Sequence, residues 1–251
     1  NKLLKKNIMI DLSADFRLKN SKIYNKYYGI KHISLNNLKK SVYGLSEINK
    51  KNLSKAKIIA CPGCYPTSIL LPLFPLIKKN LIDFKNIIDS KSGFSGAGRG
   101  VHKKFRNKNL YGSLSAYGIG SHRHNAEIQQ ELSYIKKNIE FTFTPHILPM
   151  FRGILSTIYL NYKSKANLNK IYNELRRFYM NHKFIKILKN KAISTNDVIN
   201  TNNCQISVCK SKDKKKLIIL SSIDNLIKGG AGQAVQNLNF IYNFKFNEGL
   251  K

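Results

Sequence analysis

The segment most informative about the fold is Lys57-Ile58-Ile59-Ala60-Cys61-Pro62-Gly63-Cys64-Tyr65-Pro66-Thr67, in which an apolar run is followed by a predicted turn and then by a predicted helix. Residues 57–60 are typical of the end of a buried strand, and Pro62-Gly63 predicts a sharp turn. Proline suits an early helical position, so Pro66 predicts that a helix opens here. A strand that leads through a short turn into a helix indicates an α/β element.

Two interpretations of the cysteine at position 64 follow from this turn. Cys64 is expected just ahead of the helix N-terminus, where unpaired N–H groups and the helix dipole favour the thiolate over the thiol. The position equally suits a small packing residue, which is the usual role of cysteine in apolar surroundings. The local sequence therefore suggests a nucleophile and leaves the packing role open.

The remaining elements follow from apolar periodicity. Strands are expected at residues 8–12, 57–60, 87–92, 139–144, 154–162, 206–210 and 217–222. Helices are expected at residues 68–80, 125–137, 166–181 and 233–244. Prolines at 72 and 75 predict a kink or an early stop in the first helix, a tyrosine-rich loop is expected at 24–28, and a turn at 42–45. This order predicts a fold of the α/β and α+β classes.

Length and composition narrow the class of protein. A chain of 251 residues can form one large domain or two modest ones. Its longest apolar run near the prolines, residues 69–77, is too short to span a bilayer, and the first residues do not resemble a secretory signal. Four cysteines in such a chain argue against a disulfide framework. We therefore expect a cytoplasmic protein without a membrane partner.

The formal charge of +31 invites a nucleic-acid interpretation that the pattern does not favour. The 37 lysines far outnumber the 7 arginines, and they are spread along the whole chain. Lysine, asparagine and isoleucine are all abundant, which indicates a bias in gene composition. We expect no specific nucleic-acid partner, although such a charge attracts anionic metabolites and binds polyanions nonspecifically at low salt.

A glycine-rich loop, Ser92-Gly93-Phe94-Ser95-Gly96-Ala97-Gly98-Arg99, follows one of the expected strands. Its backbone amides and hydroxyls could cradle a phosphate, with the guanidinium of Arg99 adding charge. A tight turn is the alternative. The glycine spacing matches neither the dinucleotide fingerprint nor the Walker loop.

A second polar cluster is Ser121-His122-Arg123-His124, placed before a predicted helix. Two imidazoles beside a guanidinium offer a proton shuttle next to an anion-binding group, whereas a solvated loop is the plain alternative. No zinc site is expected. Cys204 and Cys209 are five residues apart on a predicted strand and so face opposite ways, leaving the Cys61–Cys64 pair without a second pair.

Two further segments present polar side chains. The proline-flanked residues 145–153 form an expected rigid loop that carries Arg152, which could bind a carboxylate or phosphate or form a structural salt bridge. Residues 229–233 lead into the last helix, where the Gln233 amide could meet a ligand or simply begin the helix.

Taken in order, seven motifs resemble those of the N-acetyl-gamma-glutamyl-phosphate reductase (N-acetyl-glutamate semialdehyde dehydrogenase) family of arginine biosynthesis. They occupy residues 11–18, 43–47, 61–67, 92–99, 122–124, 145–153 and 228–234. The resemblance runs over nearly the whole chain. It implies part of a Rossmann-like NADP-binding domain at residues 1–64 and 230–251. Residues 65–229 would form a catalytic and dimerisation domain like that of glyceraldehyde-3-phosphate dehydrogenase, in a homodimer or homotetramer.

The resemblance also implies a reaction. Cys64 would attack the acyl phosphate of N-acetyl-L-glutamyl 5-phosphate and release inorganic phosphate, and NADPH would reduce the thioester to N-acetyl-L-glutamate 5-semialdehyde. Proton transfer would fall to His122 or His124, with His122 preferred. Arg99, Arg123 and Arg152 would bind the substrate anions. The NADP side would be formed by Ser13, Ser95, Gly96, Ala97, Gly98 and Gln233, and no metal is implied.

Two departures from the family pattern bear on these expectations. Cys61 stands where the family usually has asparagine, so it is an alternative or resolving thiol. The glycine-rich strand–turn–helix expected at the family's N-terminus is not found in these residues, which predicts weak or absent NADPH binding. The alternatives are a related reductase acting on an aspartyl or aminoadipyl phosphate, or a truncated inactive relic that binds polyanions.

Overall fold

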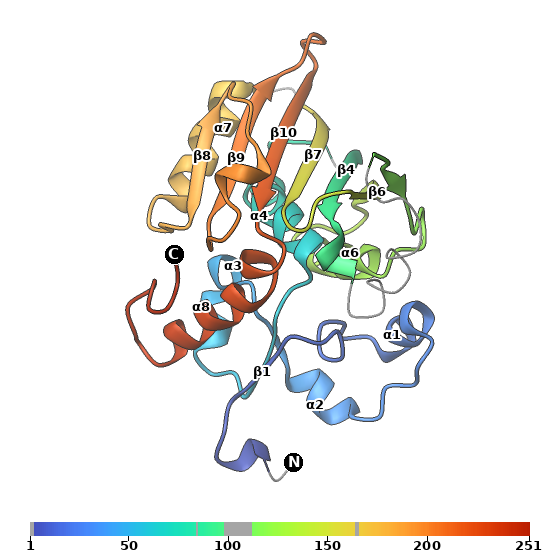
Figure 1. Cartoon of the computed structure of the whole chain (residues 1–251), viewed down its shortest axis with the longest axis vertical. Helices are drawn as coiled ribbons and strands as arrows, with labels where there is room; N and C mark the ends of the chain where they lie inside the picture. Colours follow the sequence, from blue (N-terminus) through green and yellow to red (C-terminus); the bar gives the residue numbers. More distant parts are fainter. Residues whose placement is uncertain (1–2, 84, 98–111, 164–165) are drawn as a thin grey trace.

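The computed structural model describes residues 3–83, 85–97, 112–163 and 166–251. In these ranges the strands form a three-stranded sheet of order β1-β3-β2 and a seven-stranded sheet of order β5-β6-β4-β7-β10-β9-β8. Figure 1 shows the larger sheet above the smaller one, with the N-terminus at the bottom.

The small sheet is parallel and is formed by β1 (Met9–Asp11), β2 (Val42–Tyr43) and β3 (Ile58–Ala60). Parallel neighbours require crossover connections, and helices supply them. The β1–β2 connection carries α1 (Ser21–Tyr28) and α2 (Leu35–Lys40), and the β2–β3 connection carries α3 (Ser46–Leu53). All three strands therefore end at one edge, where loops can form a site.

The large sheet is mixed. Its strands are β4 (Lys85–Gly93), β5 (Ser115–Ala116), β6 (Glu140–Leu148), β7 (Ile154–Asn161), β8 (Ile185–Lys189), β9 (Cys204–Lys210) and β10 (Lys216–Ile223). The pairs β4–β6 and β8–β9 are parallel and the other pairs are antiparallel. Along β7, Ile158 and Leu160 are buried while Tyr159 between them is exposed, as the two-residue period of a half-buried strand requires.

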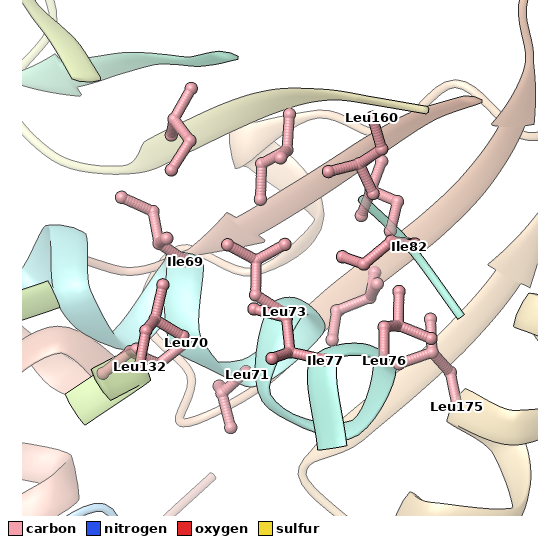
Figure 2. Close-up of a cluster of buried hydrophobic side chains, with 14 of the residues drawn as sticks. Ile69, Leu70, Leu71, Leu73, Leu76, Ile77, Ile82, Leu132, Leu160 and Leu175 are labelled. Atoms are coloured by element: carbon pink, nitrogen blue, oxygen red, sulfur yellow. The ribbon is translucent and has the colours of Figure 1, made fainter. Parts of the chain in front are cut away.

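Three helices form the layer behind the large sheet: α4 (Cys64–Lys78), α6 (His124–Ser133) and α7 (Leu168–Tyr179). α4 contacts both of the other helices and also β7 and β10. Its apolar side chains meet those of the neighbouring elements in the main core, where Figure 2 shows Leu73 and Ile77 of α4 near Leu160 of β7 and Leu175 of α7. Burial of this helix from every side explains why its sequence is apolar almost throughout.

α4 is continuous through its prolines, so the expected early stop is wrong. Proline at position 75 has no N–H and cannot bond the carbonyl of Leu71. The hydroxyl of Tyr179, at the end of α7, donates to that carbonyl at 2.5 Å. A tertiary contact therefore satisfies the group that the proline leaves unpaired.

The C-terminal helix α8 (Gly232–Ile241) returns to the small sheet. Phe240 and Ile241 pack with Ile10 of β1 and the buried Leu53 and Ile59. A π-helical turn, η4 (Ile227–Ala231), connects β10 to α8. The strands of the small sheet lie within residues 9–60 and those of the large sheet within 85–223. The functional domain boundaries given above stay a prediction.

Two further expectations about local structure are wrong. The tyrosine-rich segment is the helix α1, because the Asn20 side chain accepts from the N–H groups of Lys22 and Ile23, and Gly29 closes the helix with φ +69°. Val42–Tyr43 is the strand β2, because it pairs with Ile59 and Ala60 across the small sheet. In the part of the chain that the structure describes, no helix is long and apolar enough to cross a membrane.

Short 3-10 turns complete the description: η1 (Leu3–Lys5), η2 (Phe94–Ala97) and η3 (Thr195–Asp197). In the glycine-rich segment, Ser92 and Gly93 end β4 and residues 94–97 form η2.

Candidate active site

Cys64 is the first residue of α4, whereas the sequence predicted it just before the helix. The turn before it brings the chain from the end of β3 over Gly63, the helix N-cap. One glycine makes room for the Cys64 side chain, because a Cβ at Gly229 would lie 2.6 Å from Cys64 Cβ. Gly96 lies on the sulfur side, where an added Cβ would be in ordinary contact with Cys64 Sγ at 3.9 Å.

A cavity of about 730 Å³ opens in front of this helix start. It lies where the carboxyl end of the small sheet meets loops of the large sheet. Its lining includes seven of the residues expected from the sequence: Ser13, Cys64, Ser95, Gly96, His122, Arg123 and His124. The structure therefore brings the thiol, both imidazoles and part of the glycine-rich loop together.

The turn that carries Cys64 is held by a buried carboxylate. Glu127 Oε1 accepts the backbone N–H of Gly63 at 2.7 Å and the hydroxyl of Tyr43 at 2.6 Å. Arg17 lies 3.6 Å from the other oxygen of Glu127 and donates to the carbonyl of Cys61 at 2.7 Å. The backbone on both sides of Pro62 is thus fixed by charged side chains from distant parts of the chain.

The expected depression of the Cys64 pKa is wrong. Burial raises the pKa of the Cys64 thiol to about 11, and the charge of Arg17 and the N–H of Tyr65 offset only part of that effect. The helix start supplies favourable dipoles, but the loss of water around the sulfur is the larger contribution. The thiol therefore carries its proton at neutral pH.

The second thiol of the turn has a different environment. Cys61 is fully buried and its sulfur lies 3.9 Å from Asn237 Nδ2 of α8, outside the lining of the cavity. Burial also raises the pKa of Cys61 to about 11. Access to the cavity, and not acidity, distinguishes Cys64 from Cys61.

The two imidazoles lie against the turn and are neutral. Gly63 leaves no room for a Cβ beside His124 Nε2, and the rings of His122 and His124 are 4.8 Å apart. Burial and the charge of Arg123 lower the pKa of His122 to about 4, and burial lowers the pKa of His124 well below its usual range.

The tautomer of His122 follows from its neighbour. His122 Nδ1 accepts the backbone N–H of His124 at 3.1 Å, so the proton of the neutral ring sits on Nε2. His122 therefore offers a hydrogen-bond donor on its other side. His124 Nδ1 is buried without a partner among the described residues, so its ring can accept a proton.

The arginines expected to bind substrate are placed differently from one another. Arg123 lies at the rim of the cavity, with its guanidinium 5.8 Å from the ring of Tyr28. Arg152 does not line the cavity, and its guanidinium is held by Asp224 at 3.2 Å and by Asn200 at 2.9 Å. This is the structural salt bridge that the sequence left open, and substrate binding by Arg152 stays a prediction. Arg99 lies outside the described residues.

The residues expected on the NADP side are also divided. Ser95 and Gly96 line the cavity, Ala97 ends η2, and Gly98 lies outside the described residues. Ser13 also lines the cavity. Its hydroxyl donates to Asp11 and accepts the N–H of Asp15, and these hydrogen bonds fix the conformation of its loop.

Gln233 is fully buried and outside the lining of the cavity, and cofactor binding by Gln233 stays a prediction. Its amide donates to the carbonyl of Gly44 and the hydroxyl of Ser46. These bonds join α8 to the segment that follows β2 of the small sheet. Among the described residues no group of histidine, cysteine or carboxylate side chains could hold a metal ion.

Three residues of the site were not assigned a role from the sequence: Arg17 and Asn225, which line the cavity, and the buried Glu127, which holds the turn before Cys64. Arg17 lies within one of the seven motifs and Glu127 within an expected helix. The sequence therefore showed both charged residues but not that they pair with each other and hold the turn before Cys64. Asn225 follows β10 and bonds two other loops, a role that only the tertiary structure shows.

Comparisons with known proteins agree with this arrangement. Residues 64–225 match a family profile described as semialdehyde dehydrogenase, dimerisation domain. An N-acetyl-gamma-glutamyl-phosphate reductase of Campylobacter jejuni subsp. doylei is 45% identical, over 99% of this chain and 74% of the relative. One of the same name from Clostridium botulinum is 46% identical, over 97% of this chain and 72% of that relative.

Solved structures agree on the fold. Aspartate semialdehyde dehydrogenase II from Vibrio cholerae superposes with a TM-score of 0.64 at 16% identity, covering 81% of this chain and 69% of that one. The aspartate semialdehyde dehydrogenase of Francisella tularensis gives 0.66 at 16% identity, covering 83% and 73%. The expected α/β fold with a dimerisation domain is confirmed.

Proposed function

The chain belongs to the N-acetyl-gamma-glutamyl-phosphate reductase family, and from that membership we propose that it reduces N-acetyl-L-glutamyl 5-phosphate to N-acetyl-L-glutamate 5-semialdehyde in arginine biosynthesis. The observation that carries the proposal is the position of Cys64 at a helix start inside a cavity shared with two neutral imidazoles and an arginine. A thiol so placed can form a covalent acyl intermediate.

The first step is acyl transfer to sulfur. The Cys64 thiol gives its proton to the neutral ring of His124, because the unprotonated nitrogen of His122, Nδ1, already accepts the backbone N–H of His124. The sulfur then attacks the carbonyl carbon of the acyl phosphate. A C–S bond forms, the C–O bond to phosphate breaks, and inorganic phosphate leaves with the bonding electrons. The Nε2 proton of His122 is available to the carbonyl oxygen as negative charge develops there.

Cations around the cavity favour an anionic substrate. Arg123 at the rim pairs with no carboxylate in the described part of the chain and is free to meet a phosphate or carboxylate. Arg17, deeper in the cavity, stabilises negative charge on Cys64. The burial that raises the pKa of the free thiol also strengthens these interactions once an anion binds.

The family implies a nicotinamide cofactor, and we propose NADP. When bound, it would supply the hydride that reduces the thioester. Gly96, the backbone at Ser95 and the loop of Ser13 are the parts of the cavity that would hold its nicotinamide end beside Cys64. The role of this chain is to place that ring against the sulfur and to exclude water from the thioester.

The matched dimerisation domain supports self-association, and we propose a homodimer or homotetramer. We further propose that residues 1–64 and 230–251 belong to the nucleotide-binding part, that residues 65–229 form the catalytic part, and that the enzyme works in the cytoplasm.

The proposal is tested by substrate profiling. N-acetyl-L-glutamyl phosphate, aspartyl phosphate and an aminoadipyl phosphate would be compared by the inorganic phosphate that the purified protein releases from each, a step that needs no NADPH. We expect release from the N-acetylated compound with Cys64 present and none after Cys64→Ala. Preference for a free amino acyl phosphate would instead favour a related reductase of this fold.

A second candidate rests on the charge of +31. A relic without catalysis would bind nucleic acid in a salt-dependent manner, and Cys64→Ala would leave that binding unchanged. Such binding together with an absence of any acyl-phosphate turnover would replace the proposed function.

A further inference from the structure

One buried amide joins three loops at the cavity. Asn225, only 3% exposed, follows β10 and lines the cavity. Its Oδ1 accepts the backbone N–H of Gly153, in the loop between β6 and β7, at 2.7 Å. Its Nδ2 donates to the hydroxyl of Ser95, in the glycine-rich loop after β4, at 3.0 Å.

The orientation of this amide is fixed by its backbone partner. The N–H of Gly153 can only donate, so it selects the oxygen of the Asn225 amide, and the nitrogen must then face Ser95. Ser95 Oγ consequently acts as an acceptor toward Asn225 and keeps its own proton. Within the described ranges that hydroxyl donates to no protein acceptor, and Ser95 lines the same cavity.

Gly96 brings this pair close to the reactive sulfur. A Cβ at Gly96 would lie 3.1 Å from Asn225 Nδ2 and 3.9 Å from Cys64 Sγ. The amide, the Ser95 loop and the thiol therefore converge around one glycine. A ligand oxygen near the sulfur would meet the Ser95 hydroxyl within this space.

We propose that Asn225 is a positioning residue that turns the Ser95 hydroxyl into a hydrogen-bond donor toward an anionic oxygen of the substrate at Cys64. The inference rests on the proposed function, because it assumes that an acyl phosphate reacts with that sulfur. Beyond the proposed function, it adds Asn225, which acts through Ser95 by directing the proton of the Ser95 hydroxyl toward the ligand.

The choice of asparagine at this position follows from the two bonds. Aspartate is the same size and would still accept the Gly153 N–H, but its second oxygen would take the Ser95 proton. Ser95 would then donate to the protein and no longer to the ligand. Alanine at position 95 removes the same proton without adding charge.

The test uses alkylation of Cys64 in the purified protein by iodoacetate and by iodoacetamide, followed site by site by mass spectrometry. The ratio of the two rates reports the attraction of an anion to the sulfur, and a general loosening of the fold moves both rates together. The variants are Asn225→Asp, Ser95→Ala and the double variant.

We expect Ser95→Ala to lower the iodoacetate-to-iodoacetamide ratio by about fivefold or more, the loss of one hydrogen bond to a charged group. Asn225→Asp should lower it further through its added charge. The double variant should lose less than the product of the single losses, because both changes remove one and the same donor.

Independent, multiplicative losses would overturn the inference, as would an unchanged ratio in Ser95→Ala, whether or not Asn225→Asp folds. A wild-type Cys64 that reacts with neither reagent would overturn the proposed function together with this inference. A reactive Cys64 with multiplicative losses would overturn the role of Asn225 alone.

Discussion

Glu127 and Gly63 are joined by a 2.7 Å hydrogen bond in which the glycine amide donates to the carboxylate, although the two residues are 64 positions apart in the chain. The bond fixes the N-cap of α4 and hence the direction of Cys64, the next residue. It also places a negative charge close to the sulfur. One residue therefore both orients the thiol and restrains its ionisation.

The ionisation of Cys64 should respond in opposite directions to its two charged neighbours. Burial is the main reason that the pKa of Cys64 is about 11, Arg17 lowers that pKa and Glu127 raises it. Glu127→Gln keeps an oxygen for the Gly63 N–H and removes the negative charge, so the pKa should fall. Arg17→Met should raise it.

The measurement is the iodoacetamide rate at Cys64 between pH 7 and 11. In the wild type the rate should rise by about tenfold for each pH unit below the pKa, because only the thiolate reacts. The Glu127→Gln curve should move to lower pH. Glu131→Gln, a buried carboxylate one turn further along α6, is the matched control and should leave the curve in place. A Glu127→Gln curve that moves to higher pH would contradict the account.

Gly229 should be required for the geometry of the thiol, and its neighbour Gly230 should not. An added Cβ at position 229 would lie 2.6 Å from Cys64 Cβ, whereas one at position 230 would lie 3.6 Å from the backbone oxygen of Asn225, an ordinary contact. Gly229→Ala should therefore displace the start of α4 and slow alkylation of Cys64 by about tenfold or more, the scale of a displaced reacting group. Equal rates in Gly229→Ala and Gly230→Ala would show that the close approach does not matter.

The hydroxyl of Tyr179 should stabilise α4 only because position 75 is proline. Tyr179→Phe leaves the buried Leu71 carbonyl without its partner and should lower the free energy of unfolding by about 1–3 kcal/mol. In a Pro75→Ala background the alanine N–H can take that carbonyl, and the cost of Tyr179→Phe should fall below about 1 kcal/mol. Urea unfolding of the four proteins measures the difference, and the same cost in both backgrounds would refute the explanation.

The buried ion pair between Glu47 of α3 and Lys228 of η4 should hold the small sheet to the loop behind Cys64. Burial opposes ionisation of Glu47, but Lys228 and the hydrogen bonds from Lys228 and Gln236 outweigh it and lower the pKa of Glu47 from its usual 4.5. Because the folded pKa lies below the unfolded one, this stabilisation is present above about pH 4.5 and is lost on further acidification.

Lys228→Met leaves Glu47 buried and unpaired and should cost about 3–5 kcal/mol of unfolding free energy. Adding Glu47→Gln should recover much of that loss and should flatten the dependence of stability on pH below 4.5. Chemical unfolding at pH 7 and at pH 3.5–4.5 provides both readouts. A double variant less stable than Lys228→Met would count against the pair.

The local elements around Cys64 could be predicted because their signals are local. The apolar end of β3, the Pro62-Gly63 turn and the amphipathic face of α6 all depend on neighbours within a few positions. The helix α1 was not predicted although its signals are also local: Tyr24, Tyr27 and Tyr28 have helical spacing, and Asn20 and Gly29 are the cap residues. The unbroken α4 was missed because Tyr179, which satisfies the carbonyl freed by Pro75, lies more than a hundred positions away.

The site was predictable in its residue types but not in its electrostatics. The motif gave Cys64 and both histidines, and the cavity contains all three. The sign of the Cys64 pKa shift was not predictable, because it depends on how deeply the sulfur is buried. The protein partners of Arg152 and Gln233 are likewise tertiary contacts, which the sequence could not show, and ligand binding by either residue stays a prediction.

The most direct test of the account is to look for the acyl group on sulfur. The protein would be mixed with N-acetyl-L-glutamyl 5-phosphate without nicotinamide cofactor, and the released phosphate and the modified peptide would be measured. We predict one phosphate per reactive protein and an N-acetylglutamyl thioester on Cys64, retained in Cys61→Ala and absent from Cys64→Ala. An adduct on Cys61, or a phosphate burst that survives the loss of Cys64, would contradict it.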